Sequence, residues 1–376
     1  MKSTKKLIKN LLCIAMAVCI ILIPLTNVYA SGIPTDGNKD ESEIKNTIEN
    51  YLVNFENEDL TTKEIKAEIN RFVSQDSLLR TDSFCNLADL LLTRREIISN
   101  ANSLDLKEYN KTITFDYSNM SILNNSATVD VKMTKMWQYS FYDSESGAAN
   151  YYKFVLIKEN DSWKIDNIVG LCRTIEDYRL VELGDEISLD EMNQYISDME
   201  LELTDDYADI IEEPIRATTA YSTSNAYNYA ITYAMNYNTA YASFAPYDCA
   251  NFTSQCLYAG GKSMDFGVPL TNNCWFYTSY YIRSTSWTAC VDFRSYITSS
   301  NSQLNMSVSD WYNVWIGDII QMDNSSSVPW HNIFVSGVVY NGSGRSDLLI
   351  CAHTNDRLNV SFAAYFSGPR TYFHVN

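Results

Sequence analysis

Histidine and cysteine are scarce in this sequence. Its 376 residues include three histidines and nine cysteines. No Cys-x-x-Cys pair occurs, which argues against a structural zinc site or a dithiol redox motif. The chain is also long enough to bury a core without the dense disulfide framework that small secreted domains need. We therefore expect neither a metal nor any other cofactor.

Basic side chains are outnumbered by acidic ones. The chain has 28 Lys and Arg against 46 Asp and Glu, a formal net charge of −18 at pH 7. Residues 31–215 hold 38 acidic and 17 basic side chains, whereas residues 216–376 hold 8 and 7. Such a step in charge indicates a domain boundary. An acidic surface repels nucleic acid and anionic membranes, so we expect neither as a partner of the mature chain.

The first thirty residues predict a secretory signal peptide. A basic start is followed by an apolar run from Leu11 to Leu25 and by Val28-Tyr29-Ala30, a small-residue cleavage site. An uncleaved membrane anchor is the alternative, but the run is short for a span of about 20 residues. We expect cleavage after Ala30 and a secreted protein, either extracellular or associated with the cell wall.

Hydrophobic periodicity divides the mature chain into two domains. After a polar stub at 31–40, which we expect to be mobile, apolar residues recur at helical spacing and then at the alternating spacing of strands. The helices are expected at 41–58, 62–73 and 82–99, and the strands at 112–115, 127–133, 151–157 and 163–165. This order resembles the cystatin-like cone fold of SnoaL-type and nuclear-transport-factor-like domains, which implies an accessory domain over 41–172. Residues 173–215 predict an acidic connector, with calcium binding as the minor alternative.

Cys249 is the strongest candidate for a catalytic residue. A helix rich in tyrosine and alanine is expected over 224–245, and a second short helix begins at Cys249 and stops at Gly260-Gly261. A thiol at a helix start meets unpaired N–H groups and the positive end of the helix dipole, both of which stabilise a thiolate. The alternative is a packed core cysteine, a role that suits Cys256 in the middle of the same helix better.

A histidine that could serve this thiol lies on a later strand. Strands are expected over 317–322, 330–338 and 348–355, with a turn at 341–344. Counting back from this turn places His331 opposite residues 353–356. His353 or Asn355 could then hold the imidazole of His331 in its working tautomer. A cysteine at a helix start with a histidine on a strand is typical of papain-type thiol hydrolases.

Residues 221–376 resemble the amidase domain of secreted Gram-positive bacterial proteins, which is related to the CHAP and NlpC-type papain-like cell-wall hydrolases. The resemblance rests on ordered motifs: DCANFTSQCLYAGG at 248–261, CWFY, SWTACVDF, GDIIQ, WHNIFV and AHTND. It implies that Cys249 is the nucleophile and His331 the general base. The third catalytic position falls on His353, or on Asn355 by the papain-like alternative. Pro246-Tyr247 departs from the small residues that the family commonly shows there.

These observations predict an α+β protein in which a papain-like domain at 216–376 packs its nucleophile helix on an antiparallel sheet. The expected function is a cysteine-dependent amidase or peptidase that acts on peptidoglycan peptides or related amides. The backbone N–H of Cys249 would bind the oxyanion. Trp275, Trp287 and Trp330 are candidates to line a substrate groove, with core packing as the alternative for each and the favoured one for Trp275 and Trp287. The alternatives are a binding module on a degenerate hydrolase scaffold and a thiol acyltransferase of transglutaminase type.

Overall fold

The computed structural model describes seven stretches of the chain: residues 37–57, 62–77, 103–169, 221–324, 326–342, 344–366 and 368–376. The chain divides into two compact units, Met1–Ser42 and Glu43–Asn376, and apart from residues 37–42 the features below belong to the second. The predicted signal peptide, the helix expected at 82–99 and the acidic connector at 173–215 lie outside the described residues. No helix in the described part is long and apolar enough to span a membrane.

The N-terminal part has the predicted order of helices before strands. The elements are α2 (Gly37–Phe55), α3 (Thr62–Ile69), β1 (Tyr109–Leu123), β2 (Ser126–Gln138), β3 (Ser146–Glu159) and β4 (Ser162–Val169). Helix α2 begins within the stub that we expected to be mobile, and Asp40 in its first turn suits the helix dipole. Asn124 in the turn between β1 and β2 and Asn160 in the turn between β3 and β4 adopt the left-handed conformation that asparagine tolerates.

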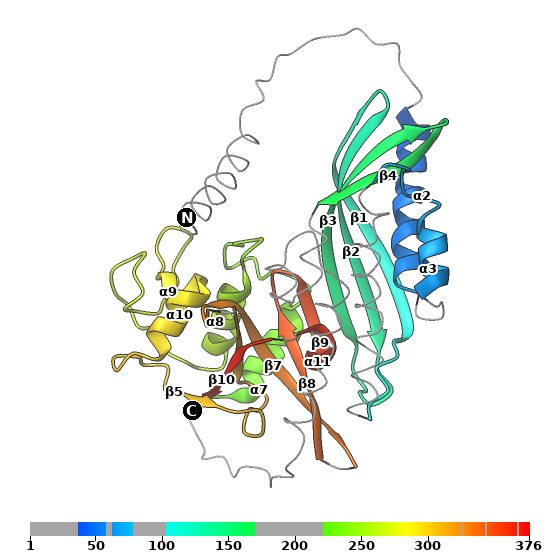
Figure 1. Ribbon diagram of the computed structural model, residues 1–376. Helices are drawn as coiled ribbons and strands as arrows, with labels where there is room; N and C mark the ends of the chain where they lie inside the picture. Colours follow the sequence, from blue (N-terminus) through cyan, green and yellow to red (C-terminus); the bar gives the residue numbers. More distant parts are fainter. Residues whose placement is uncertain are drawn as a thin grey trace, which may run out of the picture. The chain divides into compact units, whose positions relative to one another are not determined.

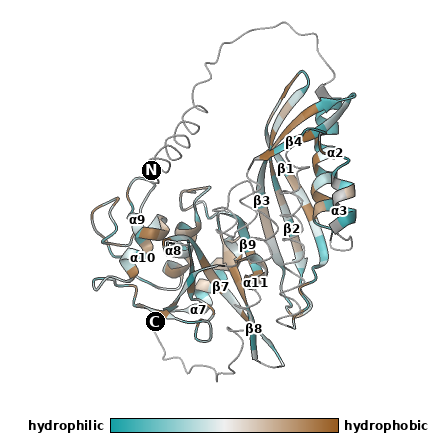
Figure 2. Ribbon diagram, in the orientation of Figure 1, coloured by the Kyte–Doolittle hydropathy of each residue, from teal (hydrophilic) through white to brown (hydrophobic). Residues whose placement is uncertain are grey.

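Side chains at the predicted spacings form the core of this part. Helix α2 carries both hydrophobic and hydrophilic residues (Figure 2), and Ile44, Ile48 and Leu52 on one face are buried. Every second residue of β2 from Ala127 to Met133 is buried as well. These residues share one cluster with side chains of β3 and β4, so the helix packs on one face of the strands.

The C-terminal part combines short helices with antiparallel strands (Figure 1). Its helices are α7 (Thr223–Tyr233), α8 (Cys249–Ala259), α9 (Thr285–Thr288), α10 (Cys290–Ile297) and α11 (Phe362–Tyr365). Its strands are β5 (Met306–Ser309), β6 (Ile319–Asp323), β7 (Pro329–Asn341), β8 (Gly344–Ala352), β9 (Asp356–Ser361) and β10 (Arg370–Val375). The strands of both parts form one ten-stranded sheet in the order β1-β2-β3-β9-β8-β7-β6-β10-β5, with β4 beside β3.

Strand β7 separates two hydrophobic clusters. Phe334 belongs to a cluster with Phe252 and Leu257 of α8, whereas Ile333 and Val335 belong to the cluster on the opposite side. Successive side chains of a strand point to opposite faces. Helix α8 therefore lies on one face of the sheet and is buried from Cys249 through Leu257. A mixed α/β fold with a large antiparallel sheet agrees with the predicted class at this level.

Helix α7 ends twelve residues before the end that periodicity predicts. The structure ends it at Tyr233 rather than at residue 245. The carbonyl oxygen of Tyr233 lies 2.8 Å from Nε2 of His353, and the ring of Tyr237 stacks on the same imidazole. The side chain of Asn238 accepts from the N–H of Ala240, a local turn that competes with helix. The contacts with His353 and the local turn at Asn238 together override the helical pattern.

Candidate functional site

A buried carboxylate fixes the backbone that leads into α8. Asp248 is 1% exposed. Its Oδ1 accepts from the N–H of Phe244 at 2.7 Å and from Nδ2 of Asn251 at 3.0 Å, and its Oδ2 lies 2.7 Å from Nδ1 of His353. The N–H of Asp248 donates to the hydroxyl of Thr354 at 3.2 Å. Asp248 therefore ties the loop before the helix to the helix itself and to the turn after β8.

Cys249 follows directly as the first residue of α8. Its sulfur lies 3.4 Å from that of Cys290, the first residue of α10. The pKa of Cys249 is held well below its ordinary value, first by the hydrogen bond from Cys290 and then by the charge and hydrogen bond of His331, while burial opposes these effects. The same contact and burial raise the pKa of Cys290. Of these two thiols, Cys249 is therefore the more readily ionised.

His331 reaches this thiol from β7. It is 2% exposed, and its ring stacks between Trp330 at 5.3 Å and Phe366 at 5.7 Å, measured between ring centroids. Its backbone pairs with Met322 of β6. The structure thus brings Cys249 and His331 together, as the sequence predicts, and stacking on both sides sets the plane of the imidazole.

Two buried amide side chains connect β7 to α8 next to His331. Nδ2 of Asn332 donates to the hydroxyl of Thr253 on α8 at 3.2 Å, and Oδ1 of Asn332 accepts from Gln321 at 2.6 Å. Gln321 also donates to the carbonyl oxygen of Cys290 at 3.1 Å. One network therefore positions the segments that carry Cys249, Cys290 and His331. Sequence reasoning missed Gln321 and Asn332, although both lie in the motifs GDIIQ and WHNIFV.

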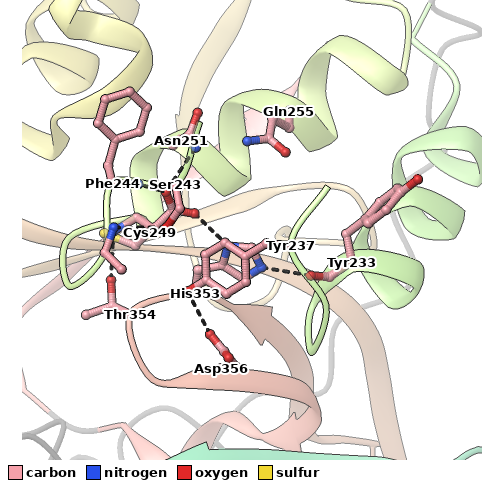
Figure 3. A network of polar contacts seen from close by, with 12 residues as sticks. Tyr233, Tyr237, Ser243, Phe244, Cys249, Asn251, Gln255, His353, Thr354 and Asp356 are labelled. Carbon is pink, nitrogen blue, oxygen red and sulfur yellow. Dashed lines mark hydrogen bonds and ion pairs between the residues drawn. The ribbon is translucent and has the colours of Figure 1, made fainter. Parts of the chain in front are cut away.

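His353 does not sit behind His331, which corrects the hairpin interpretation. The pairing of β7 with β8 ends at Phe334 and Cys351, and residues 353–355 form a turn in which Thr354 has a φ of 96°. The two ring nitrogens of His353 instead contact Asp248 and the carbonyl oxygen of Tyr233 (Figure 3). Tyr237 and Phe252 stack on its two faces, with centroids 4.2 and 4.1 Å away.

The proton inventory of the His353–Asp248 pair follows from these contacts. A carbonyl oxygen only accepts, so Nε2 must carry a proton to bond Tyr233. The contact between Nδ1 and Oδ2 needs a second proton, on one atom or the other. Two protons give the pair no net charge, whichever group holds the second. The pair therefore stabilises the loop before Cys249 without placing a net negative charge there.

The other residues that the sequence predicts for the site lie in a turn, in the core or against His331. Asn355 is 5% exposed and lies in the turn between β8 and β9. Trp275 and Trp287 are completely buried against each other, and their indole N–H groups donate to Ser254 and Asn251. The expectation that Trp275 or Trp287 lines a groove is therefore corrected: both belong to the core beside α8. Trp330 is half-buried and stacks on His331.

Aromatic side chains surround the loop before Cys249. The ring of Phe244 stacks on Tyr280 at 5.2 Å, and the guanidinium of Arg283 lies 4.4 Å from the first ring and 5.1 Å from the second. Tyr280 is 47% exposed, and Tyr247 and Tyr281 are more exposed still. Because the N–H of Phe244 bonds Asp248, this aromatic cluster (Phe244, Tyr280, Tyr281 and Arg283) is anchored to the residue that precedes Cys249.

The C-terminal part of the chain matches a known protein family. Residues 220–376 match the family model described as "Putative amidase domain". The amidase-domain match runs from the residue before Tyr221 to the end of the sequence and contains α7 through β10. The family description names an amide hydrolase and leaves the catalytic groups unspecified. In the described part of the chain, no group of three or more His, Cys, Asp or Glu residues is placed to hold a metal ion.

The individual proteins that the chain resembles here share little sequence identity with it. An uncharacterised Bacillus subtilis protein, YjcM, is 27% identical over 146 residues, which cover 37% of this chain and 32% of that protein. The chain thus matches about a third of the length of this relative. A structure described as a putative scytalone dehydratase from Novosphingobium aromaticivorans is 10% identical, with a TM-score of 0.23 over 35% of this chain and 83% of the other.

An NTF-2-like protein of unknown function from Shewanella oneidensis is also 10% identical, with a TM-score of 0.21 over 34% of this chain and 95% of the other. TM-scores this low do not establish a shared fold. The cone fold of the N-terminal part stays a prediction that agrees with the helices-then-strands order of the structure.

Proposed function

We propose that the domain at 220–376 is a cysteine-dependent amide hydrolase, with Cys249 as nucleophile and His331 as general base. One observation carries the proposal: the thiol at the first residue of α8 has its pKa lowered by Cys290 and by the charge and hydrogen bond of His331. The amidase family match supports the reaction class. The thiolate is the nucleophilic form of cysteine, so the site favours attack on a carbonyl.

The first half of the reaction forms an acyl-enzyme. His331 takes the proton of Cys249, the resulting thiolate attacks the amide carbon, and the carbonyl oxygen becomes an oxyanion. The first N–H groups of an α-helix have no intrahelical acceptors, so the N–H of Cys249 is available to bind this oxygen. As the carbon–nitrogen bond breaks, His331 gives its proton to the leaving amine, and a thioester on Cys249 remains.

The second half releases the acid. His331 takes a proton from water, and the hydroxide that results attacks the thioester carbon. The carbon–sulfur bond breaks, and the product leaves as a carboxylic acid with the Cys249 thiolate restored. A primary amine in place of water would give transfer to that amine, which is the acyltransferase alternative. Supplying a labelled amine together with the substrate separates the two outcomes.

The supporting residues then have distinct roles. We assign the orientation of the His331 ring to its stacking between Trp330 and Phe366. His353 acts as a positioning residue: through Asp248 it holds the loop before the nucleophile and balances the charge of that carboxylate. In this proposal His353, at the third position of the papain-like pattern, therefore supports the loop before Cys249 and does not contact His331.

The substrate and location are part of the same proposal. A nucleophile helix on an antiparallel sheet supports a papain-like arrangement, and the pattern of residues 1–30 supports secretion. Peptide amides of the cell wall are the proposed substrates. The exposed aromatic cluster at Phe244 and Tyr280 suits stacking against apolar or sugar faces.

The test is digestion of peptidoglycan by the purified protein, with mass spectrometry of the products. New carboxyl and amino termini from wild type, lost in Cys249→Ala and in His331→Ala, support the proposal. Cys274→Ser and His374→Ala are matched controls, because both residues lie outside the assigned machinery. Equal digestion by wild type and Cys249→Ala would falsify a thiol mechanism.

A further inference from the structure

The two facing thiols of the site differ from the other cysteines that the structure describes. Sγ of Cys249 and Sγ of Cys290 are 3.4 Å apart, and both residues are free thiols. Cys256 and Cys351 are deeply buried, and burial raises the pKa of each. Cys274 lies 3.6 Å from the carbonyl oxygen of Val268. Only one close thiol pair therefore occurs among the residues described.

We propose that Cys249 and Cys290 form a peroxide-reactive pair, in which Cys290 is the resolving cysteine and oxidation converts the two thiols to a reversible disulfide. The oxidant is a hydroperoxide, for which hydrogen peroxide is the simplest member. The amidase mechanism uses Cys290 as a hydrogen-bond donor alone, so this chemistry adds a second property to the site.

The first step is the oxidation of Cys249. Its thiolate attacks one oxygen of hydrogen peroxide, the oxygen–oxygen bond breaks, and hydroxide leaves and takes up a proton to become water. Cys249 is then a sulfenic acid. Susceptibility to this reaction follows thiolate character, and the pKa of Cys249 is lowered by Cys290 and His331.

The second step forms the disulfide. Cys290 loses its proton, and its sulfur attacks the sulfur of Cys249 as the sulfur–oxygen bond breaks and a second water leaves. In total, two thiols and one hydrogen peroxide give one disulfide and two waters. The sulfur atoms are oxidised and the peroxide is reduced. A dithiol such as dithiothreitol reverses the change by thiol–disulfide exchange.

The two sulfur atoms need only a short approach to form this bond. They are 3.4 Å apart and must come to about 2 Å. Each cysteine is the first residue of its helix. The carbonyl oxygen of Cys290 is held by Gln321, which keeps its backbone beside Cys249. Cys290 is partly exposed, which gives a small oxidant a path to the pair.

The consequence for catalysis is reversible inactivation. A disulfide removes the nucleophile, and the resolving thiol protects Cys249 from further, irreversible oxidation to sulfinic and sulfonic acids. Loss of amide hydrolysis on oxidation rests on the proposed function. Formation of the bond rests only on the two thiols.

The experiment treats the reduced full-length protein with hydrogen peroxide, blocks remaining thiols and maps the digested peptides by mass spectrometry without reduction. We expect loss of both thiols and one linked peptide that joins Cys249 to Cys290, restored by dithiothreitol. In Cys290→Ser, dimedone should trap a sulfenic acid on Cys249, and prolonged peroxide should give sulfinic acid that dithiothreitol does not restore. Cys274→Ser is the matched control and should form the same linked peptide as wild type.

Two results would overturn the inference: both thiols survive peroxide that oxidises glutathione in the same tube, or Cys249 links to a different cysteine. The peptide map of peroxide-treated wild type tests the proposal even if Cys290→Ser fails to fold. Disulfide formation in a protein without amidase activity upholds this inference and removes the proposed function. Amide hydrolysis without disulfide formation does the reverse.

Discussion

Replacing Asp248 by alanine removes a carboxylate that three buried groups share. The N–H of Phe244 and Nδ1 of His353 lose their partner, and Nδ2 of Asn251 keeps only the carbonyl oxygen of Ala242. A buried polar group left without a partner costs about 1–3 kcal/mol, and breaking one side of a buried ion pair costs about 3–5 kcal/mol. Because the three effects share one cavity and do not add, we expect Asp248→Ala to lower the free energy of unfolding by about 3–5 kcal/mol.

Asp248→Asn should lower the free energy of unfolding much less than Asp248→Ala, so the two variants can be clearly distinguished. The amide oxygen of asparagine can accept from Phe244 and Asn251, and its NH₂ can donate to Nδ1 of a neutral His353 whose Nε2–H still bonds Tyr233. We expect a loss of about 1 kcal/mol or less. Urea unfolding followed by tryptophan fluorescence measures both variants, and Asp292→Ala, with one exposed hydrogen bond, is the control. Equal losses for the Ala and Asn variants would refute the hydrogen-bond account.

Three further predictions concern binding, thiol reactivity and pH. Tyr280→Ala removes an exposed ring that we propose stacks on the substrate, a contact worth about 0.5–1.5 kcal/mol, and should raise the KM for a peptide substrate roughly 2- to 10-fold, with kcat little changed in steady-state assays. Cys290→Ala removes the hydrogen bond that lowers the pKa of Cys249 most. The pH midpoint for iodoacetamide labelling of Cys249 should therefore be higher than in wild type. Burial raises the pKa of Asp347 to about 6 from an ordinary 3.8; the folded state therefore holds its proton more tightly than the unfolded state, and this group stabilises the fold less as pH rises through 4 to 6. Between pH 5 and 7, the free energy of unfolding of wild type, measured with urea, should fall by about 1 kcal/mol relative to that of Asp347→Asn. Free energies that change in parallel with pH in the two proteins would contradict the burial argument.

The fold was predictable wherever the signals were local. Alternation over residues 127–133 placed β2, and the glycines at 260–261 placed the end of α8. The end of α7 was not predictable, because Tyr233 and Tyr237 leave the helical path to meet His353, more than a hundred residues away in the sequence. No local pattern contains such a contact.

The candidate site divides in the same way. Cys249 and His331 stand in motifs that can be recognised from the sequence, whereas the contact between Cys249 and Cys290 joins two helix starts 41 residues apart. A search for Cys-x-x-Cys spacing cannot find a thiol pair that only the tertiary structure creates. The role of His353 was misassigned because its strand ends one residue earlier, at Ala352, and the turn carries the imidazole away from His331.

The neighbouring charge of Asp248 gives His353 a role that stability alone does not describe. A carboxylate beside a thiolate disfavours the charged thiol and raises its pKa. The two protons shared by His353 and Asp248 cancel that charge. His353→Gln should leave Asp248 ionised without compensation, so the pH midpoint for iodoacetamide labelling of Cys249 should rise. Adding Asp248→Asn removes the carboxylate charge and should return the midpoint toward the wild-type value. A purely structural role for His353 predicts instead that the double variant is no closer to wild type than His353→Gln, because the second change then adds only further loss of packing.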